Sequence, residues 1–288
     1  MSKPKILVQL DGDPQASVFD SVVAVDAGVD HLFRHASVTV EQVRDLVYGA
    51  MFTRGVDDLH NTAVFVGGAD VACGEQILAA VAESFFGPMR VSVMMDANGA
   101  NTTAAAAVLV AGRHVPLEGA TALVLAGTGP VGQRTARLLA RQGARVRLAS
   151  RRLEKAEAAC RAVAEHVAGA ELTACTTNNE QETTAAMHQA QIVVAAGAPG
   201  VLLLPESIWR ASDALRVAVD LNAVPPTGID GVAPTDKAVA HGQLVCYGAI
   251  GVGGTKMKIH KAALAALFTS NDQVLDAEQI YEIGAELQ

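Results

Sequence analysis

The chain has 288 residues, half of them hydrophobic, and a formal net charge of −8. This size and apolar fraction suit two domains with separate cores. The negative charge and the lack of a basic run exclude nucleic acid and anionic membrane surfaces as expected partners, and no apolar run is long enough to span a bilayer. No signal peptide is evident. Four scattered cysteines and the absence of metal-binding histidine spacing predict free thiols, a cytoplasmic location and no metal site.

Apolar runs alternate with helical patterns through the first hundred residues, which predicts an α/β domain. We expect strands over residues 5–11, 31–33, 62–66 and 90–96, and helices over residues 17–27, 39–51 and 73–86. Ser17 and Thr39 stand at positions where a side chain can cap a helix, and Asp276 with Gln279 three residues on resembles a capping box.

A polar, turn-rich stretch at residues 96–103 leads into a helix of small residues at 104–111. Small side chains allow close backbone packing, as expected of a helix that bridges two domains. We therefore predict an N-terminal domain over residues 1–103 and a second domain over residues 104–259. One or two further helices, over residues 260–269 and 276–287, are expected to fold back and complete the N-terminal domain.

The second domain alternates strands and helices in a way that predicts a Rossmann-type, doubly wound parallel sheet. We expect strands over residues 121–126, 145–150, 191–196, 216–221 and 244–247. The expected helices cover residues 130–142 and 154–167, and a short helix follows a polar stretch and ends at residue 190.

A Gly-x-Gly-x-x-Gly pattern, formed by Gly127, Gly129 and Gly132, joins the first strand of this domain to its first helix. Gly127 allows a tight turn, Gly129 lets the backbone approach a pyrophosphate, and Gly132 lets the helix pack against the sheet. The free N–H groups of the helix then face the anion. A plain strand–helix turn is the alternative, but the order strand, turn, helix, strand favours a dinucleotide site.

The end of the second strand indicates which dinucleotide is bound. NAD sites usually carry Asp or Glu there, to accept hydrogen bonds from the ribose 2′-OH. This chain has Ser150, Arg151 and Arg152, and its first acid is Glu154. Guanidinium groups suit a 2′-phosphate, which favours NADP. The alternative is that these arginines only make the start of the next helix more soluble. That interpretation is weaker, because positive charges are unfavourable at the N-terminus of a helix.

Small or turn-forming residues follow three other strands, at residues 197–200, 222–228 and 248–254. Ligands of doubly wound sheets bind at the carboxyl ends of strands, so a flat cofactor could approach the backbone there. Lys256 and Lys258 come next, and we expect them on one side of an extended segment, either at the cofactor cleft or as a solvated pair. Asp20, on the first helix, is a candidate from the N-terminal domain.

Several segments together carry a resemblance to a known family. These segments are residues 17–20, 65–68, 86–88, 96–103, 124–132, 222–229 and 248–254. With them, essentially the whole chain resembles the bacterial methylene-tetrahydromethanopterin dehydrogenases, particularly their NADP-dependent branch. The Asn-Gly-x-Asn-Thr-Thr and Asn-Ala-x-Pro-Pro segments are more specific than the glycine pattern. The two-domain plan is also similar to that of the methylene-tetrahydrofolate dehydrogenases.

This resemblance implies a reversible hydride transfer from the methylene bridge of the reduced pterin to NADP+, which yields a methenyl cation and NADPH in one-carbon metabolism. The substrate nitrogens stabilise the cation, so no strong acid, base, nucleophile or metal is required. Catalysis would rest on orientation, with the cofactor carrying the redox step. The smaller N-terminal α/β domain would bind the pterin and the Rossmann-type domain would bind NADP.

The resemblance also implies the site residues. The NADP contacts are Gly127, Thr128, Gly129, Pro130 and Val131 at the pyrophosphate, Ser150, Arg151 and Arg152 at the 2′-phosphate, and Gly197, Asn222, Gly248, Ile250 and Gly251 near the nicotinamide. The catalytic candidates are Lys256, Asp20 and Thr102, and the substrate-binding candidates are Asp96, Asn98, Asn101, Thr102 and Lys256. Lys256 would orient a pterin carbonyl or ring nitrogen, and Asp20 would favour the cationic product.

Two alternatives stay open at this point. One is a methylene-tetrahydrofolate dehydrogenase, as main or side activity, and the other is a regulatory module that binds NADPH without turnover. Folate enzymes typically carry a Tyr-x-x-x-Lys pair, whereas Tyr48 is followed by Phe52 here, which argues against a fused cyclohydrolase. The resemblance further implies a homo-oligomer, a trimer in particular, with a neighbouring subunit near the cleft.

Overall fold

The structure is a computed structural model that describes residues 3–288. The chain divides into two compact units, Met1–Thr102 with Met257–Gln288, and Thr103–Lys256. Both divisions fall inside helices, in α4 (Ala100–Gly112) and in α9 (Ala249–Ala266). Among the residues described, no helix is long and apolar enough to cross a membrane.

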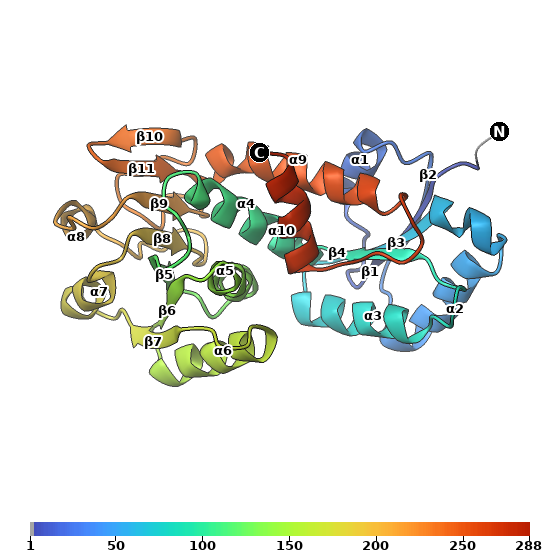
Figure 1. Cartoon of the computed structure of the whole chain (residues 1–288), viewed down its shortest axis with the longest axis horizontal. Coiled ribbons are helices and arrows are strands. Elements are labelled where there is room, and N and C mark those ends of the chain that lie inside the picture. The colour runs from blue at the N-terminus through green and yellow to red at the C-terminus, as the bar shows by residue number, and fades with distance from the viewer. Residues whose placement is uncertain (1–2) are drawn as a thin grey trace. The chain divides into compact units, whose positions relative to one another are not determined.

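The first unit is built on a five-stranded, all-parallel sheet with the strand order β12-β4-β3-β1-β2 (Figure 1). Its strands are β1 (Ile6–Asp11), β2 (His31–His35), β3 (Thr62–Gly67), β4 (Ser92–Met95) and β12 (Val274–Leu275). Its helices are α1 (Val18–Asp26), α2 (Val40–Met51), η1 (Val56–Asn61), α3 (Val71–Glu83), η2 (Ala97–Gly99) and α10 (Ala277–Glu286). Because β12 pairs with β4, the C-terminal segment extends the sheet formed by the first hundred residues.

Local capping sets where the helices of this unit begin. The Ser17 hydroxyl accepts a hydrogen bond from the Asp20 N–H, and Thr39 forms a capping box with Gln42. Asp70 caps α3, which therefore begins at Val71, two residues before the predicted start. A second capping box, between Asp276 and Gln279, starts α10 as the sequence predicted.

The second unit holds a seven-stranded sheet with the order β10-β11-β9-β8-β5-β6-β7 (Figure 1). Its strands are β5 (Thr121–Leu125), β6 (Arg145–Ser150), β7 (Leu172–Thr176), β8 (Ile192–Ala195), β9 (Val217–Asp220), β10 (Lys237–His241) and β11 (Leu244–Tyr247). Its helices, besides α4, are α5 (Pro130–Arg141), α6 (Leu153–His166), α7 (Glu180–Met187) and α8 (Glu206–Arg210). Only the edge strand β10 runs antiparallel, so the expected doubly wound parallel sheet is present.

Two edge strands of this sheet were missing from the prediction. β7 is only half-buried, and β10 is mostly exposed, so neither carries the apolar run by which the other strands were recognised. Both lie at the ends of the strand order, where one neighbour suffices to hold a strand.

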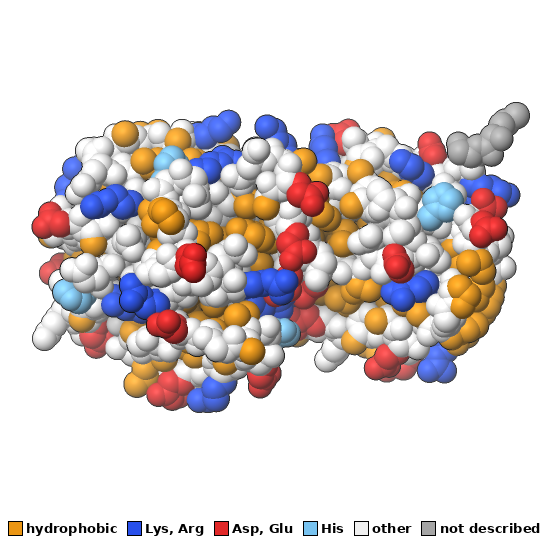
Figure 2. Space-filling model, in the orientation of Figure 1, with side chains coloured by type: hydrophobic (Ala, Val, Ile, Leu, Met, Phe, Trp, Pro, Cys, Tyr) orange, Lys and Arg blue, Asp and Glu red, His pale blue; other side chains and the backbone are white. Residues whose placement is uncertain are grey.

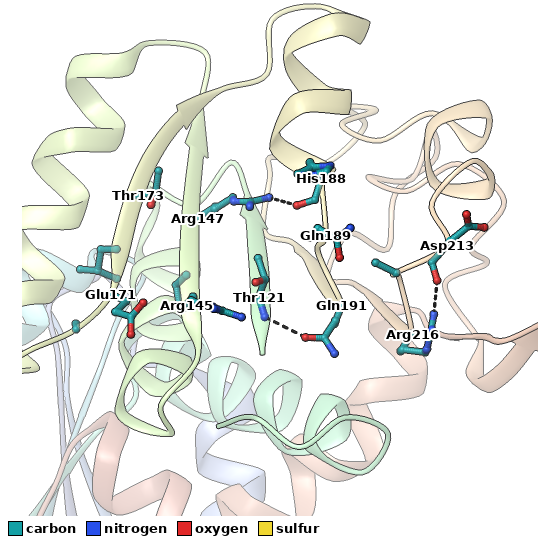
Figure 3. Close-up of a pocket in the computed structure, with 14 residues that line it drawn as sticks. Thr121, Arg145, Arg147, Glu171, Thr173, His188, Gln189, Gln191, Asp213 and Arg216 are labelled. Atoms are coloured by element: carbon teal, nitrogen blue, oxygen red, sulfur yellow. Dashed lines mark hydrogen bonds between the residues drawn. The ribbon is translucent and has the colours of Figure 1, made fainter. Parts of the chain in front are cut away.

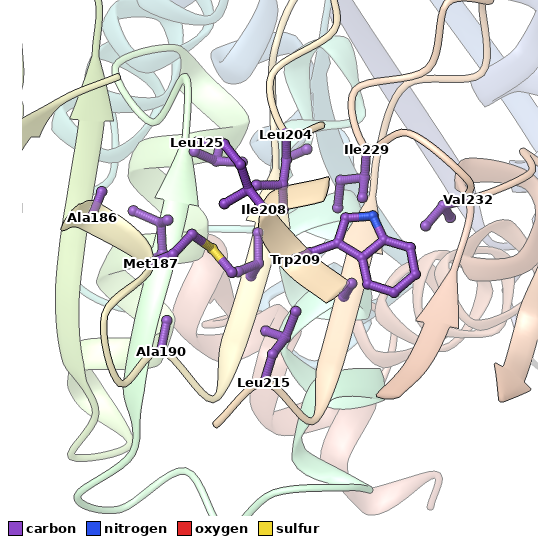
Figure 4. Close-up of a cluster of buried hydrophobic side chains, with 14 of the residues drawn as sticks. Leu125, Ala186, Met187, Ala190, Leu204, Ile208, Trp209, Leu215, Ile229 and Val232 are labelled. Atoms are coloured by element: carbon purple, nitrogen blue, oxygen red, sulfur yellow. The ribbon is translucent and has the colours of Figure 1, made fainter. Parts of the chain in front are cut away.

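A hydrophobic cluster fills one face of the second sheet (Figure 4). Leu125 comes from β5, and Met187, Ile208 and Trp209 come from α7 and α8. The Trp209 indole N–H donates a 2.8 Å hydrogen bond to the Asp230 carbonyl, so the ring is buried without an unpaired donor. This core fixes the strands whose carboxyl ends form the candidate site.

The prediction of an extended segment at Lys256 and Lys258 is wrong. Both residues lie in the continuous helix α9, which begins at Ala249. Successive helical residues are about 100° apart, so two lysines two positions apart point to different sides. The glycine-rich run before them reads as a loop by composition, but it folds as the first turns of this helix.

Candidate functional site

The glycine turn after β5 has the form that a bound pyrophosphate requires. A Cβ on Gly132 would lie 2.6 Å from the Gly127 Cα, and a Cβ on Gly127 would lie 2.6 Å from a methyl carbon of Leu148. Both positions therefore exclude larger residues, and α5 packs directly onto the strand end. Around Gly129, in contrast, a Cβ would meet nothing within 4 Å. The backbone at Gly129 is thus open on the side from which an anion approaches the N-terminus of α5.

A pocket of about 700 Å³ lies at the carboxyl ends of β6 and β7. It is lined by Ser150, Arg151 and Arg152, the residues that we expected to contact a 2′-phosphate, and by Thr128 and Gly197. The Ser150 hydroxyl accepts a 3.3 Å hydrogen bond from the Arg152 N–H, which fixes the turn that carries the arginines. An open pocket lined by cationic side chains fits the adenosine end of NADP.

Sequence reasoning missed three polar residues that line this pocket, Lys155, Thr177 and Asn178. Lys155 lies on α6, one helical turn after the two arginines, so helical spacing was a usable signal. Thr177 and Asn178 follow β7, which was not predicted as a strand, so their position at the sheet edge had no signal.

The loop after β7 is held in place by Glu182. This carboxylate accepts hydrogen bonds from the Asn178 N–H at 2.9 Å and from its side-chain amide at 3.1 Å. The backbone N–H of Asn178 is also the main reason that the pKa of Glu182 lies below its ordinary value. Asn178 is therefore fixed as one wall of the pocket.

The residues expected near the nicotinamide lie in loops that are strongly self-bonded. Asn222 is buried, its side-chain oxygen accepts from the Val224 N–H at 2.9 Å, and its amide donates to the Pro226 carbonyl at 3.2 Å. Asp220 accepts from the Asn222 and Ile229 backbone N–H groups, while its burial raises its pKa. Asn222 thus shapes the 222–229 loop through both ends of its amide.

Glycine is required at positions 248 and 251 for a different physical reason from the one expected. A Cβ on Gly248 would overlap the Ala233 carbonyl, and a Cβ on Gly251 would overlap the Asp236 carbonyl. These glycines therefore allow the first turn of α9 to pack against the 233–236 backbone of the same unit, rather than leaving space for a flat ligand. The side chain of Ile250, between them, is exposed.

In the first unit, Asp96 organises the start of α4. One carboxylate oxygen accepts from the Asn101 and Thr102 N–H groups at 2.9 and 3.0 Å, and the other accepts from the Thr102 hydroxyl at 2.6 Å. Asp96 is buried, so these bonds replace the water that a carboxylate would otherwise bind. The predicted pair of Asp96 and Thr102 is therefore brought together.

Asn101 and Asn98, also predicted for this site, have different surroundings. Asn101 is fully buried and its amide donates to the Met95 carbonyl at 2.6 Å and to Asp276 at 2.8 Å. Asn98 is exposed and has a left-handed backbone with φ of 53°. Asn101 therefore ties the C-terminal segment to this turn, whereas the side chain of Asn98 is accessible to a ligand.

His260, on α9, is a further member of this cluster that sequence reasoning missed. Its ring stacks on Phe65 with centroids 5.8 Å apart, and it lies 6.3 Å from the ring of Phe19. Its Nδ1 is 4.0 Å from a carboxylate oxygen of Asp96. No motif marks a single histidine 164 positions after its carboxylate, so only the fold reveals the pair.

Asp20 lies at the edge of the same cluster. Its carboxylate is close to Gly67 at the end of β3, where a Cβ would come within 3.6 Å of it. Burial raises the pKa of Asp20 above the ordinary value of 3.8, and the Ser17 hydroxyl and His260 offset part of that rise. Lys256, the remaining catalytic candidate, stands one helical turn before His260 on α9. Within residues 3–288, no group of His, Cys, Asp and Glu is arranged to hold a metal ion.

Together, a glycine turn at a helix N-terminus and a cationic pocket at the next strand define an NADP-dependent dehydrogenase with a Rossmann-type domain. Residues 123–211 match the family model "Saccharopine dehydrogenase NADP binding domain", and residues 18–98 match "Methylene-tetrahydromethanopterin dehydrogenase, N-terminal". The chain is 45% identical over 289 residues, all of both chains, to the "Bifunctional protein MdtA" of Methylorubrum extorquens. The chain therefore belongs to the methylene-tetrahydromethanopterin dehydrogenase family.

A second relative in the same organism agrees. It is the "NAD(P)-dependent methylenetetrahydromethanopterin dehydrogenase", 27% identical over 280 residues and 94% of each chain. Among solved structures, the fold is similar to that of a 5-ketofructose reductase of Gluconobacter sp. strain CHM43, with a TM-score of 0.52, 16% identity and 99% of each chain covered. A quinate dehydrogenase from Corynebacterium glutamicum has a TM-score of 0.50 at 13% identity, over 99% of this chain and all of the other. These two likenesses concern the fold alone.

Proposed function

We propose that this enzyme transfers a hydride reversibly from 5,10-methylene-tetrahydromethanopterin to NADP+, yielding the methenyl cation and NADPH in one-carbon metabolism. The observation that carries the proposal is the combination, in one chain, of the family's N-terminal model over residues 18–98 and a cationic pocket beside a dinucleotide turn. The full-length identity of 45% to a member of this family supports the same reaction.

The cofactor side of the proposal rests on the second unit. NADP+ supplies the hydride-accepting ring when bound. Thr128, Gly129 and Val131 bind the pyrophosphate through backbone N–H groups. Gly127, whose N–H is bonded to the Ala149 carbonyl, and Pro130, which has no N–H, shape the turn around it. Ser150, Arg151 and Arg152, with Lys155, bind the 2′-phosphate through charge-assisted hydrogen bonds. Gly197, Asn222, Gly248, Ile250 and Gly251 shape the nicotinamide end, with Asn222 and the two helix glycines acting through the backbone that they fix.

The pterin side rests on the first unit and on Lys256. Asn98, which is exposed, is the polar group of this turn that contacts the pterin, and the buried Thr102, held by Asp96, positions the turn behind it. Asp96 and Asn101 position this turn from inside the fold. Lys256 orients a pterin carbonyl or ring nitrogen, and Asp20 stabilises the developing cation. The barrier falls mainly because the reacting carbons are held close together.

The ring of Phe19 adds an apolar surface to this side. It is 54% exposed and lies beside the buried His260 ring. A flat pterin ring can stack on such a surface. We infer that Phe19 contacts the substrate and that His260 keeps it in place.

Initial-rate measurements of NADP+ and NAD+ reduction with each methylene-pterin test the proposal. NADP+ reduction with methylene-tetrahydromethanopterin is the expected result. A relative carries the word bifunctional in its name, and a rate with methylene-tetrahydrofolate would add that substrate as a second activity. Tight NADPH binding with no turnover on either pterin would instead identify a regulatory module and refute the proposal.

We further propose a homo-oligomer, specifically a trimer, in the cytoplasm. Val18, Val22 and Val25 form an apolar stripe along α1 and are 67%, 56% and 62% exposed. Figure 2 shows a second gathering of hydrophobic side chains on the first unit, over α2. The four cysteines are free thiols, as expected in a reducing compartment. Light scattering is expected to give three times the chain mass, and a monomer in dilute solution would contradict this part.

A further inference from the structure

A second hollow lies in the Rossmann-type unit, at the amino ends of β5 to β9 (Figure 3). Its volume is about 1090 Å³. The 2′-phosphate pocket lies at the carboxyl ends of β6 and β7, so the two sites are at opposite edges of one sheet. We call this second site the amino-edge hollow, defined by Thr121, Arg145, Arg147, Thr173, Gln189 and Arg216.

The polar lining of the hollow is unusual for its place in the fold. Both faces of a central parallel strand are normally covered and apolar. On β6, Arg145, Arg147 and Ala149 share one face, and Ala149 belongs to the hydrophobic cluster under α7. The short helix α7 ends at Met187 and covers only the carboxyl part of this face. Two guanidinium groups therefore occupy the part where a longer helix would pack.

The guanidinium groups of the hollow are held in place by backbone carbonyls. Arg147 donates to the Ala186 carbonyl at 2.7 Å and also to that of His188. Arg145 donates to the Gly119 carbonyl and Arg216 to the Asp213 carbonyl, both at 2.7 Å. Each of the three arginines forms these bonds through only one of its two terminal nitrogens. The N–H groups of the second terminal nitrogen are thereby held in a fixed orientation for a ligand. Fixed donors lose little freedom when a ligand binds.

The hollow also carries a net positive charge. Within the described part of the chain, none of the three arginines forms an ion pair with a carboxylate. Glu171 and Asp213 also line the hollow, and the three guanidinium groups outweigh these two carboxylates. The excess positive charge attracts an anion.

Gln189 adds a strained polar residue to the wall. Its φ is 59°, a left-handed conformation at the end of α7 where glycine would be less strained. Figure 3 shows its side chain among the arginines, next to Gln191. A glutamine here keeps an amide at the hollow that a glycine would not provide.

We propose that the amino-edge hollow is a second anion-binding site, separate from the cofactor site, which takes a phosphorylated small molecule of about nucleotide size. Guanidinium forks bind the phosphate oxygens, and the Thr173 hydroxyl and the glutamine amides bind the polar remainder. A volume near 1000 Å³ is at the upper end of ordinary small-molecule sites, which accommodates a ligand of this size.

Titration calorimetry with inorganic tripolyphosphate tests this site in the NADP+-saturated enzyme, in which the 2′-phosphate pocket is filled. Thr173→Glu places a negative charge in the hollow and leaves every arginine anchored, and Arg145→Gln removes one guanidinium. Each variant is expected to weaken binding about tenfold or more. Arg161→Gln, an exposed substitution on α6 outside the hollow, is the control and should leave binding unchanged.

Three results would overturn the proposal. The first is no binding to the saturated wild-type enzyme. The second is binding that is lost when NADP+ is present, since the probe would then occupy the cofactor site. The third is equal weakening by all three substitutions, which would indicate non-specific attraction to surface charge.

Discussion

The hydroxyl of Thr102 donates a 2.6 Å hydrogen bond to the buried carboxylate of Asp96. The same carboxylate caps the first turn of α4 through two backbone N–H groups. Because the carboxylate fixes both the helix start and the hydroxyl, the direction of the Thr102 side chain is set by the fold.

Removal of this hydroxyl should therefore reduce both stability and activity. Thr102→Val keeps the shape of the side chain but deprives Asp96 of one donor, and we expect a loss of about 2 kcal/mol in the free energy of unfolding. The kcat/KM for the methylene-pterin should fall about tenfold or more, while the KM for NADP+ stays unchanged. Thr102→Ser retains the hydroxyl, so it should keep most of the stability and most of the kcat/KM of the wild type. Urea unfolding and initial rates measure the two effects, and a valine variant with wild-type rates would remove Thr102 from the site.

Asp20 gives a prediction about pH. Burial raises the pKa of Asp20 in the folded protein above 3.8, so the folded state favours the protonated form. The group therefore contributes stability below its unfolded pKa and loses that contribution as the pH rises through its folded pKa. Asp20→Asn should accordingly be more stable than the wild type at pH 7 and equally stable below about pH 3.8. Urea midpoints across this range give the test, and a stability difference independent of pH would contradict it.

The same variant has an opposite effect on activity if Asp20 stabilises the cation. Asp20→Asn should lower kcat for formation of the methenyl product about tenfold, with little change in the KM for NADP+. A more stable but less active enzyme is the combined signature. Unchanged kcat would leave Asp20 as a structural residue only.

The glycines of α9 offer a matched pair. A Cβ on Gly251 would overlap the Asp236 carbonyl, whereas a Cβ on Gly253 would meet nothing within 4 Å. Gly251→Ala should destabilise the protein by about 3 kcal/mol or prevent folding. Gly253→Ala should stabilise it by up to about 1 kcal/mol, because alanine favours the helix. Equal unfolding midpoints for the two variants would show that α9 does not pack on the 233–236 segment.

Cofactor preference depends on the cationic pocket. Arg152→Ala should raise the KM for NADP+ about tenfold or more, with a much smaller change for NAD+, because only NADP+ carries the 2′-phosphate. Lys155→Ala should also raise the KM for NADP+, by a smaller factor. Arg161→Ala, on the same helix but outside the pocket, should leave this KM unchanged. Equal effects on both cofactors would remove the 2′-phosphate assignment.

The sequence was sufficient to predict the role of a residue where only one physical reason explains that residue type at that position. Gly127 and Gly132 exclude a side chain as the glycine pattern requires, and Ser17, Thr39 and Asp276 cap the helices they were expected to cap. The caps and the Gly132–Gly127 contact join neighbours in the chain, and the contact of Gly127 with Leu148 follows from the strand–turn–helix–strand order that the sequence already shows.

The sequence was insufficient where contacts are distant or ambiguous. His260 reaches Asp96 only because α9 packs into the first unit, and Asn178 enters the pocket because β7 forms a strand without an apolar run. The glycines after β11 looked like a ligand loop, but they allow a helix to approach its own unit. A small residue indicates close approach without saying what approaches.

Direct hydride transfer is the central claim, and isotope transfer tests it most directly. The enzyme is supplied with NADP+ and methylene-tetrahydromethanopterin that carries two deuterium atoms on its methylene carbon, and the NADPH formed is analysed by mass spectrometry. We predict one deuterium in each NADPH and one retained in the methenyl product. NADPH without deuterium, or no NADPH at all, would contradict the account.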